Sequence, residues 1–225
     1  MKKTVLLVFL VFSCICVSFR AEGAPPTPEQ LYENGRRYEL GKGVSKNDSK
    51  AFSFYLKAAE AGHVEAQART GLFYAFGRGT GENVKKALFW YEKAARQGHY
   101  GAQNNLANIL WTGPKGVKKD REKALDFWFL SAMHGYGEAQ LKMALFYLSR
   151  GEQDPAAYRK AYYWNFQAAL QGLPEAQWWL GMLREAGKGV EKDMKTAVHW
   201  YKKAAANGHR EAKARLKNLN PHPEK

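Results

Sequence analysis

Apolar residues recur along this chain at the spacing of amphipathic helices, and two kinds of helical stripe alternate. The first kind has side chains at offsets of zero, four, seven and eight residues, as in Ala66, Thr70, Phe73 and Tyr74. These offsets place the side chains on one helix face, which we expect to be buried. The second kind alternates small with aromatic residues, as in Ala87, Trp90, Tyr91, Ala94 and Ala95. In such a stripe the rings of one helix fill the space beside the alanines of the next, so the pattern predicts packed helices.

The two stripes belong to a unit that occurs five times. A glycine closes the second stripe of every unit, at Gly62, Gly98, Gly135, Gly172 and Gly208, with steps of 36 or 37 residues. A nearly constant period of this length is typical of stacked helical hairpins. We therefore predict five repeats, over 29–63, 64–99, 100–136, 137–173 and 174–209. A capping helix and a loose tail are expected over 210–225.

A second recurrent element keeps the same register. The triplet Glu65-Ala66-Gln67 follows a closing glycine, and looser or equal copies follow the other glycines. Each copy marks the start of the unit's first helix, and the closing glycine marks the end of its second helix. Unit one has Gln30 in place of the opening alanine. Gly71 lies in the middle of a first helix, where glycine is unfavourable unless a neighbour packs closely, so we expect such a neighbour.

Double-glycine turns are predicted to join the two helices of most units. The segment Gly77-Arg78-Gly79-Thr80 is representative, because glycine adopts the left-handed conformation that ends helices. Residues suited to the N-cap of the second helix follow at matching places, namely Asn47, Asn83, Asp120 and Asp193. A phosphate-binding loop is excluded, because the full P-loop pattern is absent and no strand is predicted before the turn. Unit four lacks the double glycine over 149–155.

These residues resemble the Sel1-like repeat family, relatives of the tetratricopeptide repeats. The family pattern runs Ala, Leu-Gly-x-x-Tyr, a Gly-x-Gly-Val turn, Lys-Ala, and Trp-Tyr-x-Lys-Ala-Ala-x-x-Gly, and residues 66–98 and 176–208 follow it nearly throughout. The resemblance covers 29–209. It implies an all-α fold, an α-solenoid superhelix of about five Sel1-like or TPR-like helical hairpins with a C-terminal capping helix, and an adaptor role. Some bacterial members have a disulfide in each repeat and have been discussed as penicillin-binding or weakly β-lactamase-like; this chain has no cysteine pairs in its repeats.

The first residues have the pattern of a secretory signal. Lys2 and Lys3 precede an apolar run over 5–17, which is shorter than the roughly 20 residues that a membrane-spanning helix needs. We predict a signal peptide over 1–23, cleaved between 18 and 24, and a bacterial protein that is periplasmic or secreted. Cys14 and Cys16 both lie in this run, so the mature chain would have no cysteine. Lipid attachment at Cys14 stays open as an alternative.

The chain is strongly basic, with 35 Lys and Arg against 21 Asp and Glu and a formal charge of +14. Such a charge favours acidic partners, which in an export compartment are acidic proteins, cell-wall polymers or anionic lipids. Nucleic acid is not expected as a partner there. For most of the lysines a solvated basic surface that aids solubility is the favoured explanation, because they recur at repeat positions that face away from the apolar stripe.

Candidate catalytic or metal chemistry is sparse. His63, His99 and His209 each follow a closing glycine directly, but successive helical layers lie about 8 to 10 Å apart, too far to share a metal bound at about 2 Å. We expect these histidines to be turn or packing residues. The chain has none of the Ser-x-x-Lys, Gly-x-Ser-x-Gly or His-Glu-x-x-His motifs. We therefore expect no enzyme, no metal and no cofactor.

The candidate binding residues lie at positions where the residue differs from unit to unit, whereas the residues that define the repeat are kept. They come two and three residues after the opening alanine, on first helices, which line the concave surface in stacked hairpins. The candidates are Arg69, Asn104, Asn105, Leu141, Lys142, Trp178 and Trp179. Asparagines can hydrogen-bond a peptide backbone and tryptophans can clamp an apolar group, although packing of one tryptophan between layers remains an alternative.

The resulting hypothesis is a monomeric, non-catalytic adaptor that binds a protein or peptide partner on its concave face. One alternative is a basic envelope-binding protein that recognises cell-wall polymer or anionic lipid. The other is a hydrolase of β-lactam or cell-wall substrates.

Overall fold

The computed structural model describes residues 25–219, and this part of the chain is all helical. Eleven helices follow one another: α1 (Pro28–Leu40), α2 (Asp48–Glu60), α3 (Val64–Phe76), α4 (Val84–Arg96), α5 (Tyr100–Thr112), α6 (Arg121–Met133), α7 (Gly137–Leu148), α8 (Pro155–Leu170), α9 (Pro174–Ala186), α10 (Met194–Ala206) and α11 (Arg210–Leu219). The predicted signal peptide, with Cys14 and Cys16, and residues 220–225 of the predicted tail lie outside the described residues.

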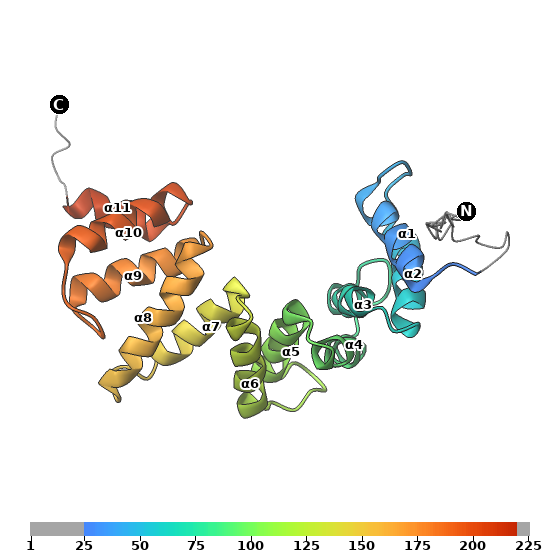
Figure 1. Ribbon diagram of the computed structural model, residues 1–225, viewed down its shortest axis with the longest axis horizontal. Coiled ribbons are helices and arrows are strands. Elements are labelled where there is room, and N and C mark those ends of the chain that lie inside the picture. Colours follow the sequence, from blue (N-terminus) through green and yellow to red (C-terminus); the bar gives the residue numbers. More distant parts are fainter. Residues whose placement is uncertain (1–24, 220–225) are drawn as a thin grey trace, which may run out of the picture.

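Consecutive helices pack as hairpins, and the hairpins stack in chain order along an arc (Figure 1). Helices α1, α3, α5, α7 and α9 are the first helices of the five units, and α2, α4, α6, α8 and α10 are the second. The first helices α3 and α5 touch directly, and α4 and α6 run along the outer side of the arc. Helix α11 packs on α10 and covers the last unit. The predicted all-α solenoid with a capping helix is confirmed.

Three of the five hairpins are closed by an aromatic ring of the second helix on a glycine of the first. The ring is a tyrosine in each, in the pairs Gly35–Tyr55, Gly71–Tyr91 and Gly181–Tyr201. A Cβ at position 181 would lie 2.3 Å from Cε1 of Tyr201, which is far inside van der Waals contact. The units with Ala107 and Ala144 instead have Trp128 and Asn165 at the tyrosine position. The close neighbour expected at Gly71 is therefore the unit's own tyrosine.

Neighbouring units are joined by a buried glutamine of the recurrent triplet. Gln67 donates from Nε2 to the carbonyl of Ala59 in the preceding unit, and its Oε1 accepts from Gln97 at the end of its own unit's second helix (2.7 Å). Gln140 makes the equivalent bonds with Ala132 and Gln171. Gln177 makes them with Ala169 and Asn207. We call this arrangement the amide staple. Because a buried amide is costly when unpaired, the staple fixes the distance between layers.

The predicted caps are confirmed. Each of Asn47, Asn83, Asp120 and Asp193 accepts a hydrogen bond from the backbone N–H three residues ahead. Gly77 and Gly79 have positive φ, and a Cβ on Gly79 would lie 2.2 Å from the carbonyl oxygen of Asp48 in the preceding unit. The double-glycine turn thus serves stacking as well as helix ending.

The two irregular units keep the hairpin by other means. In unit four the ring of Tyr158 lies over Gly151, and Asp154 caps the longer helix α8 in place of the double-glycine turn. In unit one Thr27 is the N-cap, and Gln30 completes a capping box by accepting from the Thr27 N–H. This capping role explains why Gln30 replaces the opening alanine.

The Gly–Tyr contact predicts that a Gly→Ala substitution lowers the free energy of unfolding where a tyrosine packs on the glycine, and not elsewhere. Gly181→Ala places a methyl group inside the Tyr201 ring, so we expect a loss of about 1 to 3 kcal/mol in the free energy of unfolding, in spite of alanine's better helix propensity. Gly81→Ala is the matched control, because nothing lies within 4 Å of its Cβ. Urea unfolding of both variants measures the difference, and equal stability of the two would contradict the packing described.

Candidate functional site

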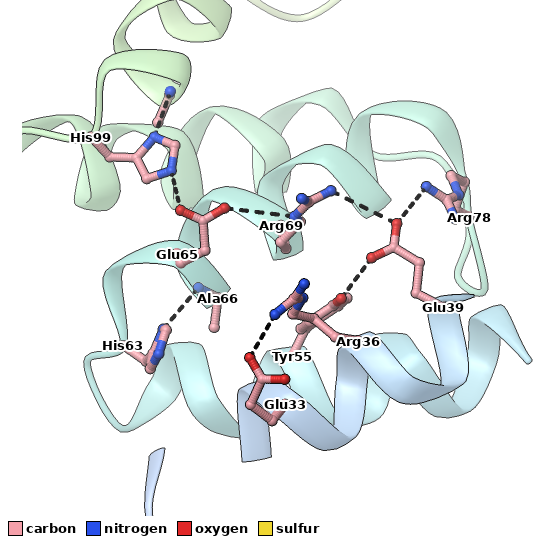
Figure 2. A network of polar contacts seen from close by, with 11 residues as sticks. Glu33, Arg36, Glu39, Tyr55, His63, Glu65, Ala66, Arg69, Arg78 and His99 are labelled. Atoms are coloured by element: carbon pink, nitrogen blue, oxygen red, sulfur yellow. Dashed lines mark hydrogen bonds and ion pairs between the residues drawn. The ribbon is translucent and has the colours of Figure 1, made fainter. Parts of the chain in front are cut away.

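The first helices are anchored by histidines that bind in two directions. Nδ1 of His99 accepts from the N–H of Ala102, so the hydrogen is on Nε2, which lies 2.8 Å from Oε2 of Glu65 in the preceding unit (Figure 2). His63 and His209 make the same pair of contacts, His63 with Ala66 and Glu29, and His209 with Ala212 and Glu175. Each imidazole therefore caps its helix and ties it to the previous unit. The expectation that these are turn residues is confirmed.

This histidine link is missing in the middle of the chain. Tyr136 and Leu173 occupy the histidine position in front of α7 and α9, where no side chain caps the helix. Gly101 also replaces the glutamate that Tyr136 would otherwise face. The inner surface of units three and four is therefore less polar than that of units one and two.

An ion-pair network covers the inner surface of units one and two (Figure 2). Glu39 accepts hydrogen bonds from the Tyr55 hydroxyl (2.6 Å) and from Arg78 (3.0 Å). Arg69 lies between two carboxylates, 3.8 Å from Glu39 and 3.7 Å from Glu65. The hydrogen bond from His99 holds the pKa of Glu65 below its usual value. The titratable groups of this region are thus bound mainly to one another.

The two members of each candidate pair point in different directions. The first member lies between layers: Asn104 is fully buried with Nδ2 3.5 Å from Glu138, and Leu141 packs against the apolar cluster around Leu180. Trp178 is stacked on His209, with ring centroids 5.2 Å apart, and lies beside Tyr201, while its half-buried ring also lines a groove of about 560 Å³ between α9 and α11. The prediction that Asn104 is on the binding surface is wrong, because its position faces the neighbouring first helix.

The second member of each pair lines a groove between first helices. Asn105 and Arg69 line a groove of about 550 Å³ between α3 and α5. Lys142 lines one of about 420 Å³ between α5 and α7, and Trp179 one of about 450 Å³ between α7 and α9. The indole N–H of Trp179 donates to Glu175, which orients the ring. These four candidates are therefore placed on the inner surface.

Further groove residues escaped the sequence analysis. They include Leu72, Asn108, Leu145 and Met182, which come six residues after the opening alanine of their units, and Ser149 and Ala186, which come ten residues after it. Offsets of three, six and ten form a second helical stripe beside the buried one. That stripe could have been identified from the repeat spacing. The aromatic residues that form the groove walls, Trp111, Phe146 and Tyr136, could be identified only from the structure.

Within residues 25–219 no group of three or more His, Cys, Asp or Glu side chains is arranged to hold a metal ion. In the same range no helix is both long and apolar enough to cross a membrane.

Comparison with known proteins decides the family. The Sel1 repeat model matches residues 31–63, 64–99, 101–136, 137–173 and 174–209. The chain belongs to the Sel1 repeat proteins. Proteins with these repeats generally mediate protein–protein interaction.

Solved Sel1 repeat structures share the fold. A Sel1 repeat protein from Oxalobacter formigenes is 33% identical with a TM-score of 0.75, over 86% of this chain and 76% of that one. The protective antigen c5321 of uropathogenic Escherichia coli is 29% identical with a TM-score of 0.59, over 86% of this chain and 49% of that one.

Curated relatives are longer proteins. Chitin synthase regulator SKT5 of Saccharomyces cerevisiae is 35% identical over 50% of this chain and 16% of its own length. Chitin synthase regulatory factor 3 of Schizosaccharomyces pombe is 28% identical over 85% of this chain and 17% of its own length. DAP3-binding cell death enhancer 1 of Rattus norvegicus is 35% identical over 75% of this chain and 33% of its own length. The chain thus spans a third or less of these relatives.

Separate substitution of the two tryptophans tests whether Trp178 packs between layers and Trp179 lines a groove. Trp178→Ala removes a ring packed between layers, so we expect a loss of about 2 to 4 kcal/mol in the free energy of unfolding, whereas Trp179→Ala should cost less than about 1 kcal/mol. Denaturant unfolding of both variants measures this. A larger loss for Trp179→Ala would show that the assignment of groove and core is reversed.

Proposed function

We propose that this Sel1 repeat protein is a non-catalytic adaptor that binds an extended segment of a protein partner along its concave face. The observation that carries the proposal is the succession of grooves between first helices, each lined by a different side chain: Asn105, Lys142 and Trp179. The frame of each unit repeats, but these lining residues do not. Successive grooves of similar size that are lined by different side chains are suited to recognising a particular amino-acid sequence in the partner.

The dimensions support an extended ligand. Neighbouring helical layers lie about 8 to 10 Å apart, and an extended chain advances about 3.3 Å per residue, so each layer meets about three residues. The three grooves together would contact a segment of roughly nine residues. Asn105, whose side chain also hydrogen-bonds Tyr91, supplies an amide for the peptide backbone, and Trp179 with Met182 and Leu148 supplies an apolar wall for a side chain.

The charge on this face supports recognition by shape and amide contacts. The first helices α1, α3, α5, α7 and α9 carry five Lys and Arg against seven Asp and Glu. The basic excess of the chain therefore lies elsewhere. The carboxylates Glu39 and Glu65 are occupied by Arg78 and His99, which supports a binding role over acid–base catalysis.

Selection from a library of displayed random peptides, with the full protein as bait, tests this function. We expect Trp179→Ala to weaken the best peptide about tenfold or more, the loss typical of a buried aromatic anchor, and Asn105→Ala to weaken it less. Lys202→Gln, on the outer side of α10, is the control. Affinity should persist when salt is raised from about 0.1 M to about 1 M. Peptides that lose affinity in Lys202→Gln but not in Trp179→Ala would refute the concave site.

Export is part of this proposal and rests on the basic pair and apolar run at residues 2–17. Mass spectrometry of protein from the native host should find a chain that lacks its first 18 to 23 residues. An intact N-terminus on the native protein would contradict export through a cleaved signal.

A further inference from the structure

Helices α6 and α8, the second helices of units three and four, expose large apolar side chains. Phe129, Leu130 and Met133 of α6 are 45%, 45% and 60% exposed, and Leu170 of α8 is 63% exposed. Phe129 also touches Trp164 of α8, with ring centroids 6.2 Å apart, so the two helices form one surface. We call these four side chains the apolar crest. Exposed apolar side chains are ordinary when scattered, but a group of this kind indicates an interaction site.

The other repeats show what these positions otherwise carry. Met133 and Leu170 come two residues before a closing glycine, where units one, two and five have Glu60, Arg96 and Ala206. Leu130 occupies the place of three lysines, which are Lys57, Lys93 and Lys203. The fold therefore tolerates polar or small residues at these positions. The crest is a feature of units three and four, and the hairpin does not require it.

The charge of the outer side is opposite to that of the inner side. The second helices α2, α4, α6, α8 and α10 carry thirteen Lys and Arg against five Asp and Glu. Lys93 and Lys203 flank the crest from units two and five, and each lies 4.8 Å from an aromatic ring, that of Phe89 and of Trp200. The outer side is thus basic with an apolar centre.

Because the stacked hairpins form an arc, the apolar crest lies on the part of the outer side that would first touch a flat surface. Units three and four are the middle of the arc, and α6 lies on its outer bend (Figure 1). We propose that the outer side docks on an anionic lipid bilayer, with the apolar crest entering the interface and the flanking lysines meeting the headgroups. This combination of buried apolar area and electrostatic attraction is what holds peripheral proteins on membranes. The concave face then remains open for its partner.

A lipid surface fits the crest better than a protein partner does. Anchors at protein interfaces are centred on well-packed pockets. None of the grooves described above is lined by a crest side chain, and each crest side chain is at least 45% exposed. Exposed apolar side chains that need no matching shape are accommodated by a fluid interface.

Vesicle co-sedimentation of the full protein tests the proposal. Wild type should bind vesicles of phosphatidylglycerol and phosphatidylethanolamine, and bind phosphatidylcholine vesicles at least about tenfold more weakly. The triple variant Leu130→Gln, Met133→Ala, Leu170→Ala keeps the net charge and takes residues found at equivalent positions of other repeats. It should lower the partition coefficient about tenfold or more, because three half-exposed apolar side chains no longer enter the bilayer. Lys202→Gln with Lys203→Gln should weaken binding in a salt-dependent way.

Two controls separate this proposal from the concave site. Trp179→Ala should bind vesicles like wild type, and the triple variant should bind the selected peptide like wild type and keep its thermal midpoint. Absence of binding to anionic vesicles at low salt, or equal binding by wild type and triple variant, would overturn the proposal. Sedimentation velocity without lipid gives a third result: a dimer that the triple variant loses would overturn it by assigning the crest to a second copy.

Discussion

The amide staple is the contact on which the rest of this structure depends. One buried glutamine reaches back to a carbonyl of the preceding unit and forward to the end of its own unit's second helix, as Gln67 does with Ala59 and Gln97. Leaving a buried amide unpaired costs about 1 to 3 kcal/mol, so the units cannot slide without losing the bond to the preceding unit. The glycine under each tyrosine sets the distance within a hairpin, and the staple sets the distance between hairpins.

The spacing fixed in this way explains why the two sides of the protein can differ in chemistry. Residues that hold the hairpins together are buried and repeat from unit to unit, whereas the inner stripe of Asn105, Lys142 and Trp179 and the outer crest around Met133 differ between units. The middle units also lose part of the frame. Gln103 lacks a partner for Oε1, because His134 stands where Gln97 stands in unit two, and the histidine link is missing before α7 and α9. Units three and four, which carry the crest, therefore have fewer of the recurring links than units one and two.

The fold could be predicted from the sequence because each packing position occurs five times, once in every repeat. The closing glycines, the N-cap residues and the small residue at Gly71 each have one physical explanation, and the structure confirms them. The candidate site was harder. A helix face that borders a neighbouring layer looks as variable as one that borders a groove, so the burial of Asn104 could not be distinguished from the exposure of Asn105. Contacts between units, such as His99 with Glu65 across 34 residues, depend on superhelical geometry that periodicity alone does not provide.

The most direct measurement of the central claim is a crystal structure of the protein with a selected peptide bound. We expect the peptide to run extended across α5, α7 and α9, with its backbone at Asn105 and an apolar side chain against Trp179. A peptide seated on the second helices, or one that binds only after the stacked units separate, would contradict the view that evenly spaced hairpins present an inner binding face.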